Sequence, residues 1–290
     1  GRGTISMPIG RVVKNYNGYY YVDTGTGELT ECRRRGKIKE KIFVGDKLEF
    51  TATDAGKGII EKILPRFNLL KRPTIANIDA MVIVMAAASP DPNKTLVDKM
   101  LMTCEHGGLT PVLCFNKCDL SKDTGHEYAA YYRQCGYAVY LVSAATEKGL
   151  DELKLGLSGK VTAFAGPSGV GKSSLLTAIA GKELHIGEVS RKIGRGRHTT
   201  RHSEIIRVDN NTYVIDTPGF SALDFAHMEA KAIAALMPDI RKFAPHCRFA
   251  SCLHRAEPDC AVKQAVADGL IAPERYETYC KILDELSERK

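Results

Sequence analysis

Residues 166–173 constrain the fold of this 290-residue chain more than any other stretch. They read GPSGVGKS and match the phosphate-binding loop pattern G-x-x-x-x-G-K-[ST] at every fixed position. An apolar run at 161–165 predicts a buried strand before the loop, and residues 174–180 predict a helix after it. Such a turn presents backbone N–H groups to an anion, and the helix N-terminus adds partial positive charge. The sequence therefore predicts a nucleotide site rather than a glycine turn beside a surface lysine.

The loop residues have distinct expected roles. Lys172 is expected to reach the β- and γ-phosphates, and the Ser173 hydroxyl is expected to bind Mg²⁺. The remaining expected nucleotide contacts in this stretch are Gly166, Ser168, Gly169, Val170, Gly171 and Ser174.

Composition favours an ordinary globular protein, with 44% hydrophobic and 26% charged residues. No stretch approaches the length of a membrane span and no signal peptide opens the chain, so we expect no membrane contact. Nine cysteines, an odd number, lie partly in apolar runs, which argues against a disulfide framework and predicts a reducing, cytoplasmic setting. Residues 1–6 precede Met7 and are set aside from the fold argument.

The net charge of +7 is concentrated in the first quarter of the chain. Residues 1–72 hold 15 Lys and Arg against 8 Asp and Glu, whereas residues 73–290 hold 26 of each. This segregation predicts an anionic partner for the N-terminal region.

The N-terminal region has the pattern of a small β-barrel. Short strand-like runs separated by glycine turns extend from about residue 10 to residue 67, which is typical of an oligonucleotide-binding (OB) barrel. Tyr19, Tyr20 and Tyr21 precede a basic cluster at 33–41, so the region offers stacking surfaces and phosphate partners. At least one of these tyrosines must point inward. A basic solvated face is the alternative, and the charge segregation favours nucleic-acid binding.

The middle of the chain alternates strands and helices. Buried strands are predicted at 79–88, 111–115, 138–142 and 161–165, with further strands at 204–208 and 212–215. This order predicts a doubly wound α/β sheet whose ligand lies at the carboxyl ends of the strands. Polar motifs follow three of these strands: N-K-C-D at 116–119, S-A at 143–144 and D-T-P-G at 216–219.

The tail contains a cluster of metal-ligand residues. Cys247, Cys252, His254 and Cys260 lie within fourteen positions, and three thiolates with one imidazole suit a closed, structural Zn²⁺ site. His246 is a rival for the imidazole ligand, and small buried thiols between helices are the alternative.

Helices are predicted at 222–243, with a break at Pro238, and at 259–268 and 274–288. In the last helix, one face is predicted to comprise Tyr276, Cys280, Leu283 and Ser287.

The three polar motifs resemble the set found in GTPases. In that family an N-K-x-D motif reads guanine, and Asp119 matches the aspartate that accepts from N1–H and the exocyclic amine. Asn116 matches the residue that supports the loop, and Lys117 the one whose stem packs on the base. Ser143 and Ala144 resemble the S-A-K element whose backbone contacts the guanine oxygen, although alanine replaces its lysine at position 145.

The D-T-P-G motif resembles the family's D-x-x-G motif. This resemblance implies that Asp216 holds Mg²⁺ through water and that the Gly219 N–H reaches the γ-phosphate. Together with the phosphate loop, these motifs favour GTP over ATP.

The order of the motifs points to one family. The guanine elements at 116–145 precede the phosphate loop at 166–173, so the domain is circularly permuted. With a basic barrel before it and a Cys/His cluster after it, the chain from Met7 onward resembles the RsgA/YjeQ family of ribosome small-subunit biogenesis GTPases.

The resemblance implies three domains: an OB-fold-like RNA-binding domain at 1–68, a permuted GTPase domain at 69–222 and a helical zinc-binding subdomain at 223–290. It also implies that the small ribosomal subunit and its rRNA are partners and that His254 is the zinc-binding histidine. We expect a monomer that binds GTP and GDP.

The resemblance also identifies candidates for the hydrolysis step. Phe220 occupies the position after D-x-x-G where many GTPases place a water-orienting glutamine, so slow intrinsic turnover is expected. Residues 194–201 resemble the family's first switch, in which Thr200 completes the Mg²⁺ shell. His198 is the candidate that positions the water, or alternatively a ribosome contact.

Two functions are consistent with these features. The first is a GTPase that is stimulated by the small ribosomal subunit and times subunit maturation. The second is a GTP-gated RNA-binding switch with incidental hydrolysis, which Phe220 keeps open. A P-loop kinase is disfavoured by the guanine motif.

Overall fold

A computed structural model describes residues 7–181 and 204–288. These residues belong to two compact units whose segments interleave along the chain. One unit contains the chain up to residue 82, residues 147–165 and residues 171–220; the other contains 83–146, 166–170 and the chain from 221 onward. The three-domain division with boundaries after residues 68 and 222 stays a prediction.

The N-terminal strands form a closed barrel, which confirms the OB-type prediction. The barrel comprises β1 (Ile9–Tyr16), β2 (Tyr19–Asp23), β3 (Leu29–Arg34), β4 (Lys47–Ala52) and β5 (Lys57–Ile63), in the order β1-β2-β3-β5-β4. Only the β3–β5 pair is parallel among these five strands. The turn at Asn17 and Gly18 has positive φ at both residues, as a tight hairpin requires. The barrel core contains Val12, Val22, Cys32, Leu48, Phe50 and Ile60.

The three tyrosines of β2 divide between the two faces of the strand, as strand alternation requires. Tyr20 packs against the barrel core. On the other face, the Arg33 guanidinium lies 4.8 Å from the Tyr19 ring centroid, and the Lys14 ammonium lies 4.9 Å from the Tyr21 ring centroid. Alternating cations and aromatic rings therefore line the outside of the barrel.

After a short hairpin of β6 (Leu69–Lys71) and β7 (Thr74–Ala76), the chain enters a six-stranded sheet. Its order is β10 (Ala138–Leu141), β9 (Pro111–Asn116), β8 (Ala80–Ala86), β11 (Val161–Ala165), β13 (Tyr213–Asp216) and β12 (Ile206–Arg207). The β10–β9 and β11–β13 pairs are parallel, whereas the edge strand β12 is antiparallel to β13. The strand predicted at 204–208 is therefore a two-residue arm of a hairpin.

Within the described residues, four helices accompany these strands: α1 (Lys94–His106), α2 (Lys122–Gln134), α3 (Leu150–Leu157) and α4 (Lys172–Ala180). Asn93 caps α1, because its side-chain oxygen accepts the Leu96 N–H at 3.0 Å. Among the helices in the described part of the chain, none is both long and apolar enough to cross a membrane.

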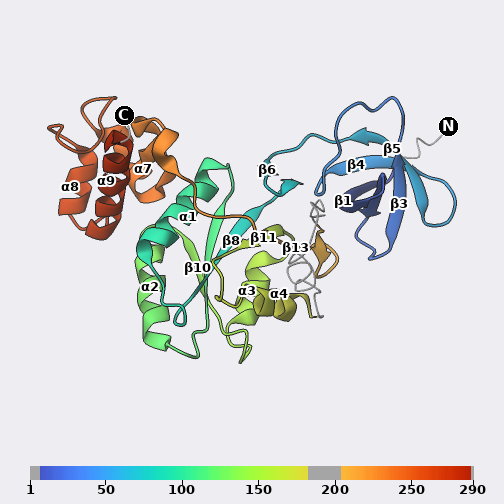
Figure 1. Ribbon diagram of the computed structural model, residues 1–290, viewed down its shortest axis with the longest axis horizontal. Coiled ribbons are helices and arrows are strands. Elements are labelled where there is room, and N and C mark those ends of the chain that lie inside the picture. Colours follow the sequence, from blue (N-terminus) through green and yellow to red (C-terminus); the bar gives the residue numbers. More distant parts are fainter. Residues whose placement is uncertain (1–6, 182–203, 289–290) are drawn as a thin grey trace, which may run out of the picture. The chain divides into compact units, whose positions relative to one another are not determined.

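The tail folds into short helices around one core. They are the 3₁₀-helix η2 (Phe225–His227), α6 (Ala230–Ile233), η3 (Ala234–Leu236), α7 (Pro238–Phe243), η4 (Ala244–His246), α8 (Ala261–Ala267) and α9 (Pro273–Glu288). Pro238 begins α7 rather than interrupting a longer helix, since proline suits the first helical turn. Figure 1 shows α7, α8 and α9 side by side, and Met237, Val262 and Tyr279 share their buried core.

The predicted face of α9 is partly correct, since Leu283 is buried and Tyr276 and Cys280 pack half-buried against the core. The buried residues are Arg275, Thr278, Tyr279, Ile282, Leu283 and Leu286. Ser287 is exposed and Tyr276 is half-buried, so the face is rotated by about one position. The buried face begins with Arg275, and a charged residue is ordinarily assigned to solvent.

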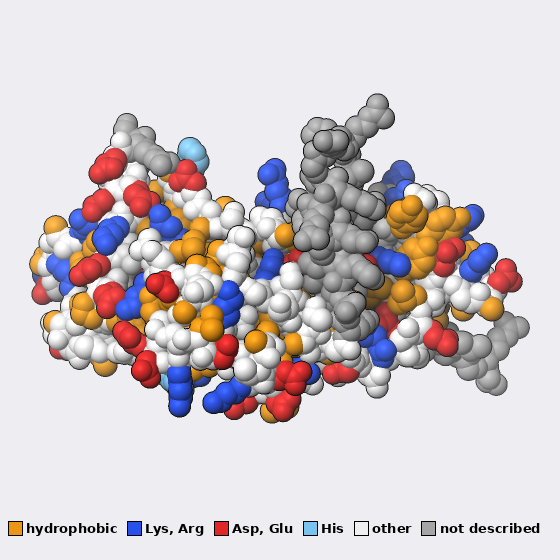
Figure 2. Space-filling model, turned by 60° about the horizontal axis from the view of Figure 1, so that its bottom comes forward, with side chains coloured by type: hydrophobic (Ala, Val, Ile, Leu, Met, Phe, Trp, Pro, Cys, Tyr) orange, Lys and Arg blue, Asp and Glu red, His pale blue; other side chains and the backbone are white. Residues whose placement is uncertain are grey.

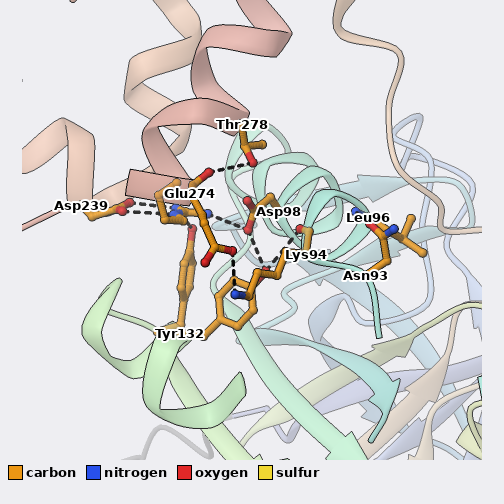
Figure 3. A network of polar contacts seen from close by, with 10 residues as sticks. Asn93, Lys94, Leu96, Asp98, Tyr132, Asp239, Glu274 and Thr278 are labelled. Atoms are coloured by element: carbon orange, nitrogen blue, oxygen red, sulfur yellow. Dashed lines mark hydrogen bonds and ion pairs between the residues drawn. The ribbon is translucent and has the colours of Figure 1, made fainter. Parts of the chain in front are cut away.

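Arg275 is fully buried and is held by two carboxylates. Its guanidinium donates to Asp239 through two nitrogens, at 2.8 and 3.0 Å, and to Asp98 at 2.9 Å. The Tyr132 hydroxyl also donates to Asp98, at 2.9 Å. Figure 3 shows these groups converging from several helices, with Thr278 and Glu274 beside them. The network joins α9 to α1 and α7 by charge-assisted hydrogen bonds.

Replacing Arg275 by methionine is expected to destabilise the protein by about 3–5 kcal/mol, because two carboxylates would remain buried without a partner. The free energy of unfolding from urea titration measures this. Arg241→Met is the matched control, since Arg241 also links α7 to α1 through Glu105 but is half-exposed. It should cost less than about 1 kcal/mol. Equal costs for the two variants would contradict this account.

Candidate functional site

The phosphate-binding loop occupies the predicted strand–loop–helix position. It follows β11, and α4 begins at Lys172. A Cβ at Gly166 would lie 2.4 Å from the Val84 carbonyl oxygen, so only glycine fits there. Gly169 and Gly171 both have φ of +83°, in the left-handed region. Three of the motif's glycines are therefore required by the backbone itself.

The guanine-type motif holds the backbone of this loop. The Asn116 side-chain amide donates to the Val170 carbonyl at 3.0 Å, in a buried position. The Lys117 ammonium donates to the Gly169 carbonyl at 2.6 Å and to the Ser89 carbonyl at 2.5 Å. The motif that was predicted to read the base thus also fixes the phosphate-binding loop.

The second guanine element supports the first through a side chain. The Ser143 hydroxyl donates to a carboxylate oxygen of Asp119 at 2.8 Å and accepts the Thr146 N–H at 3.1 Å. The Ala144 N–H donates to the Asn116 side-chain oxygen at 3.0 Å. The sequence predicted only backbone contacts from residues 143 and 144 to the nucleotide, so the role of Ser143 in orienting Asp119 was missed.

Lys172 and Asp216 form an ion pair, with 2.7 Å between Nζ and a carboxylate oxygen. Asp216 is the last residue of β13, and the next residue, Thr217, is buried and donates its hydroxyl to the Phe164 carbonyl at 2.8 Å. This bond fixes the start of the D-x-x-G segment against β11.

The other predicted residues of this site divide into two groups. Ser173 and Ser174 lie exposed at the first turn of α4, and Gly219 is exposed after β13. His198 and Thr200 lie outside the described residues.

The four ligand-type residues of the tail come together in one cluster. The candidate ligand atoms of Cys247, Cys252, His254 and Cys260 all lie within 4.8 Å of one another. His254 Nδ1 lies 3.4 Å from the sulfurs of Cys247 and Cys260, and those two sulfurs are 3.9 Å apart. A tetrahedral Zn²⁺ with bonds of about 2.3 Å places its ligands roughly 3.7 Å apart, so the donor set fits this metal. His246 is not part of the group found among the described residues.

The ionisation of the cluster depends on whether a metal is bound. Burial raises the pKa of the Cys252 thiol to about 12, so without a metal its thiolate form is strongly disfavoured. Burial lowers the pKa of His254, which keeps its imidazole neutral and able to bind a metal. A bound Zn²⁺ would stabilise the deprotonated thiols.

Two tyrosines of α9 hold the segment that carries the cluster. The Tyr276 hydroxyl donates to the His254 carbonyl at 2.6 Å, and the Tyr279 hydroxyl donates to the Leu253 carbonyl at 2.9 Å. His254 has a φ of +60°, which is rare for a residue other than glycine. The backbone is therefore held in an uncommon conformation that brings the histidine to the cysteines.

The fold and the loop motifs define a class of protein: a P-loop GTPase whose guanine motif precedes its phosphate-binding loop in the chain, behind an OB-type barrel. A family model described as RsgA GTPase matches residues 63–226, and one described as RsgA N-terminal domain matches residues 9–60. The chain belongs to the RsgA GTPase family.

Individual relatives agree along nearly the whole chain. The protein named small ribosomal subunit biogenesis GTPase RsgA from Moorella thermoacetica is 45% identical over 285 residues, covering 97% of this chain and 98% of that protein. Its namesake from Geobacillus thermodenitrificans is 43% identical and covers 98% and 99%.

Two solved structures share the fold. The crystal structure of YloQ, a circularly permuted GTPase, has a TM-score of 0.83 at 34% identity and covers 100% of this chain and 98% of that one. The crystal structure of YjeQ from Thermotoga maritima has a TM-score of 0.81 at 36% identity, covering 98% and 99%. The prediction of a permuted GTPase of this family is confirmed.

Replacing Asp119 by asparagine is expected to weaken GTP binding by at least about 100-fold, because the carboxylate's two charge-assisted bonds to guanine are lost. Affinity for xanthosine triphosphate should rise, since its C2 carbonyl accepts the new amide N–H. Titration calorimetry with both nucleotides measures this. Asp123→Asn, at an exposed position of α2, is the control. Unchanged GTP affinity in Asp119→Asn would show that this loop does not recognise the guanine base.

Replacing Cys252 by serine is expected to abolish stoichiometric zinc in the purified protein and to lower its Tm by on the order of 10 °C. Metal analysis and thermal unfolding measure the two effects. Cys280→Ser is the control, because Cys280 lies in α9 but outside the cluster. Full zinc occupancy in Cys252→Ser would refute the proposed ligand set.

Proposed function

We propose that this protein hydrolyses GTP to GDP and phosphate slowly on its own and faster on the small ribosomal subunit, and that hydrolysis is coupled to late maturation of that subunit. The names and full-length similarity of the relatives support the partner. The observation that carries the GTPase assignment is the bonding of Asn116 and Lys117 to carbonyls of the phosphate-binding loop. It fixes a base-reading loop and a phosphate-binding loop to each other.

In the proposed site, Lys172 binds the β- and γ-phosphates and is thereby drawn from Asp216. Asp216, through water, the Ser173 hydroxyl and Thr200 would hold Mg²⁺, which when bound would neutralise charge on the phosphates. The backbone N–H of Gly219 contacts the γ-phosphate, and the loop glycines cradle the triphosphate. The work of these groups is positioning and electrostatic stabilisation rather than covalent chemistry.

Slow hydrolysis is attributed to Phe220. Its side chain has no group to orient the attacking water, and it occupies the position where many GTPases have glutamine. We assign water positioning to His198, which would act when the protein is bound to the subunit. A 10³-fold stimulation corresponds to lowering the barrier by roughly 4 kcal/mol.

The flanking regions supply binding surfaces in this proposal. Residues 1–68 bind rRNA, residues 69–222 bind the nucleotide, and residues 223–290 form a zinc-stabilised subdomain that adds a second contact to the subunit. The protein acts as a monomer in the cytoplasm. All nine cysteines lie among the described residues and none of them forms a disulfide there, in keeping with a reducing compartment.

Phosphate release measured with and without purified small subunits tests this function. A stimulation on the order of 100-fold or more is expected at saturating subunits. A wild-type rate that small subunits leave unchanged would contradict the proposal.

The competing function is a GTP-gated RNA-binding switch in which hydrolysis is incidental, and Phe220 is the observation that favours it. His198→Ala separates the two functions. If hydrolysis times release, this variant should bind GTP and subunits normally but remain bound, as measured by subunit co-sedimentation after GTP addition. Release at the wild-type rate would favour the switch.

A further inference from the structure

The barrel is bonded to the hairpin that ends at Asp216. This hairpin comprises β12 and β13, and it belongs to the same compact unit as the barrel. The Ile205 N–H donates to the Val13 carbonyl of β1 at 2.8 Å. The Tyr213 hydroxyl donates to a carboxylate oxygen of Asp23, the last residue of β2, at 3.0 Å. Both arms of the hairpin therefore contact the barrel.

The backbone bond depends on an irregularity in the barrel. The pairing of β1 with β2 shifts in register between Val12 and Lys14, so Val13 is left out of the ladder. The backbone groups of a bulged residue are not paired within its own sheet, so they can form hydrogen bonds outside it. The carbonyl of Val13 uses this freedom to accept from Ile205.

The carboxylate of Asp23 is the centre of the side-chain contacts. It is buried, and its second oxygen accepts the Gly25 N–H at 2.8 Å. Burial and the hydrogen bond to Asp23 raise the pKa of Tyr213 to about 12, so the phenol stays protonated and donates. An unpaired carboxylate at this depth would be costly, so the contact is strongly held.

Arg207 of β12 completes the junction. Its guanidinium donates to the Gly25 carbonyl at 2.9 Å, and a Cβ at Gly27 would lie 2.5 Å from one of its nitrogens. Its buried Nε has no hydrogen-bond partner and lies 3.5 Å from the carboxylate of Asp23. That distance is a few tenths of an ångström beyond an ordinary hydrogen bond. A small movement of the barrel turn toward the hairpin would bring these two groups within hydrogen-bonding distance.

The same two barrel strands carry the cation–aromatic surface. Lys14 and Tyr21 are cross-strand neighbours, and Lys14 directly follows the bulged Val13. At the right of Figure 2, where the barrel lies, basic side chains (blue) stand beside hydrophobic ones (orange). A strand is a stiff element, so a displacement that RNA causes at this surface is transmitted along β1 and β2 to Val13 and Asp23.

We propose that Asp23, Arg207 and Tyr213 form a junction through which RNA bound on the barrel adjusts the position of Asp216, so that Asp23 is a positioning residue for subunit-stimulated GTP hydrolysis. This inference rests on the proposed function. Tyr213 and Asp216 are the first and last residues of the four-residue strand β13, which is paired with β11 along its whole length. A displacement at Tyr213 is therefore transmitted to the carboxylate that would hold Mg²⁺.

The size of the effect is set by how sharply catalysis depends on geometry. A misplacement of about 1 Å costs on the order of 100-fold in rate. Losing the junction should therefore remove roughly 10- to 100-fold of the stimulated rate. Without RNA on the barrel the junction has no displacement to transmit, so the unstimulated rate of hydrolysis should be retained.

The experiment compares GTP hydrolysis by the full chain alone and with saturating small subunits, together with subunit affinity by co-sedimentation. Asp23→Asn should keep the basal kcat, the KM for GTP and the subunit affinity within about twofold and lose roughly 10- to 100-fold of the stimulated kcat. Asp46→Asn is the matched control. Asp46 is a fully buried barrel carboxylate paired with Arg66, and its variant should keep stimulation.

Tyr213→Phe removes one hydroxyl and little volume, so it decides the question if Asp23→Asn fails to fold. It should lower the stimulated kcat in the same direction, and the double variant should be no worse than Asp23→Asn, because the two residues share one bond. Stimulation of either single variant to the wild-type level overturns the inference. A loss of basal rate or subunit affinity equal to the loss of stimulation also overturns it. A wild-type protein that subunits do not stimulate refutes the proposed function itself.

Discussion

Two hydrogen bonds from the guanine motif to the phosphate-binding loop organise the nucleotide-binding part of this protein. The donors, Asn116 and Lys117, come from the end of β9, and the accepting carbonyls of Val170 and Gly169 follow β11. Both acceptors are backbone carbonyls, so these contacts depend on the backbone path that the loop glycines permit. In this chain the two loops form this contact although the guanine motif precedes the phosphate-binding loop in the sequence. The sheet order, rather than the sequence order, sets the site.

Much of this arrangement was predictable from the sequence, because it depends on local patterns. Buried parallel strands read as apolar runs, and the phosphate-binding loop has a spacing that only one backbone geometry satisfies. The barrel strands were predictable from glycine turns at short intervals, and the zinc-type cluster of the tail from the close spacing of its cysteines. These features are set by residues close together in the chain, and the structure placed them with small changes in their bounds.

The features that were missed depend on partners far away in the sequence. Arg275 was not recognised as a core residue, because its buried state depends on Asp98 and Asp239, which lie 177 and 36 positions away. The contact of the Ser143 hydroxyl with Asp119 was missed for the same reason. The carbonyl of Val13 is available to Ile205 only because of a register shift, and no pattern in β1 predicts where a ladder skips a residue. Roles of this kind depend on the assembled fold.

The path of the chain after the D-x-x-G motif also differs from the alternation of strands and helices before it. In this chain no further strand of the sheet comes after D-x-x-G within the described residues; the chain passes instead into the helices of the tail. Leu223 lies four positions after Gly219, and its N–H donates to the Thr103 hydroxyl of α1 at 3.0 Å. The segment that follows the motif is thus short, and its far end is fixed by this hydrogen bond. Three residues, 220–222, separate the motif from this fixed position, so any movement of Gly219 must be accommodated within them.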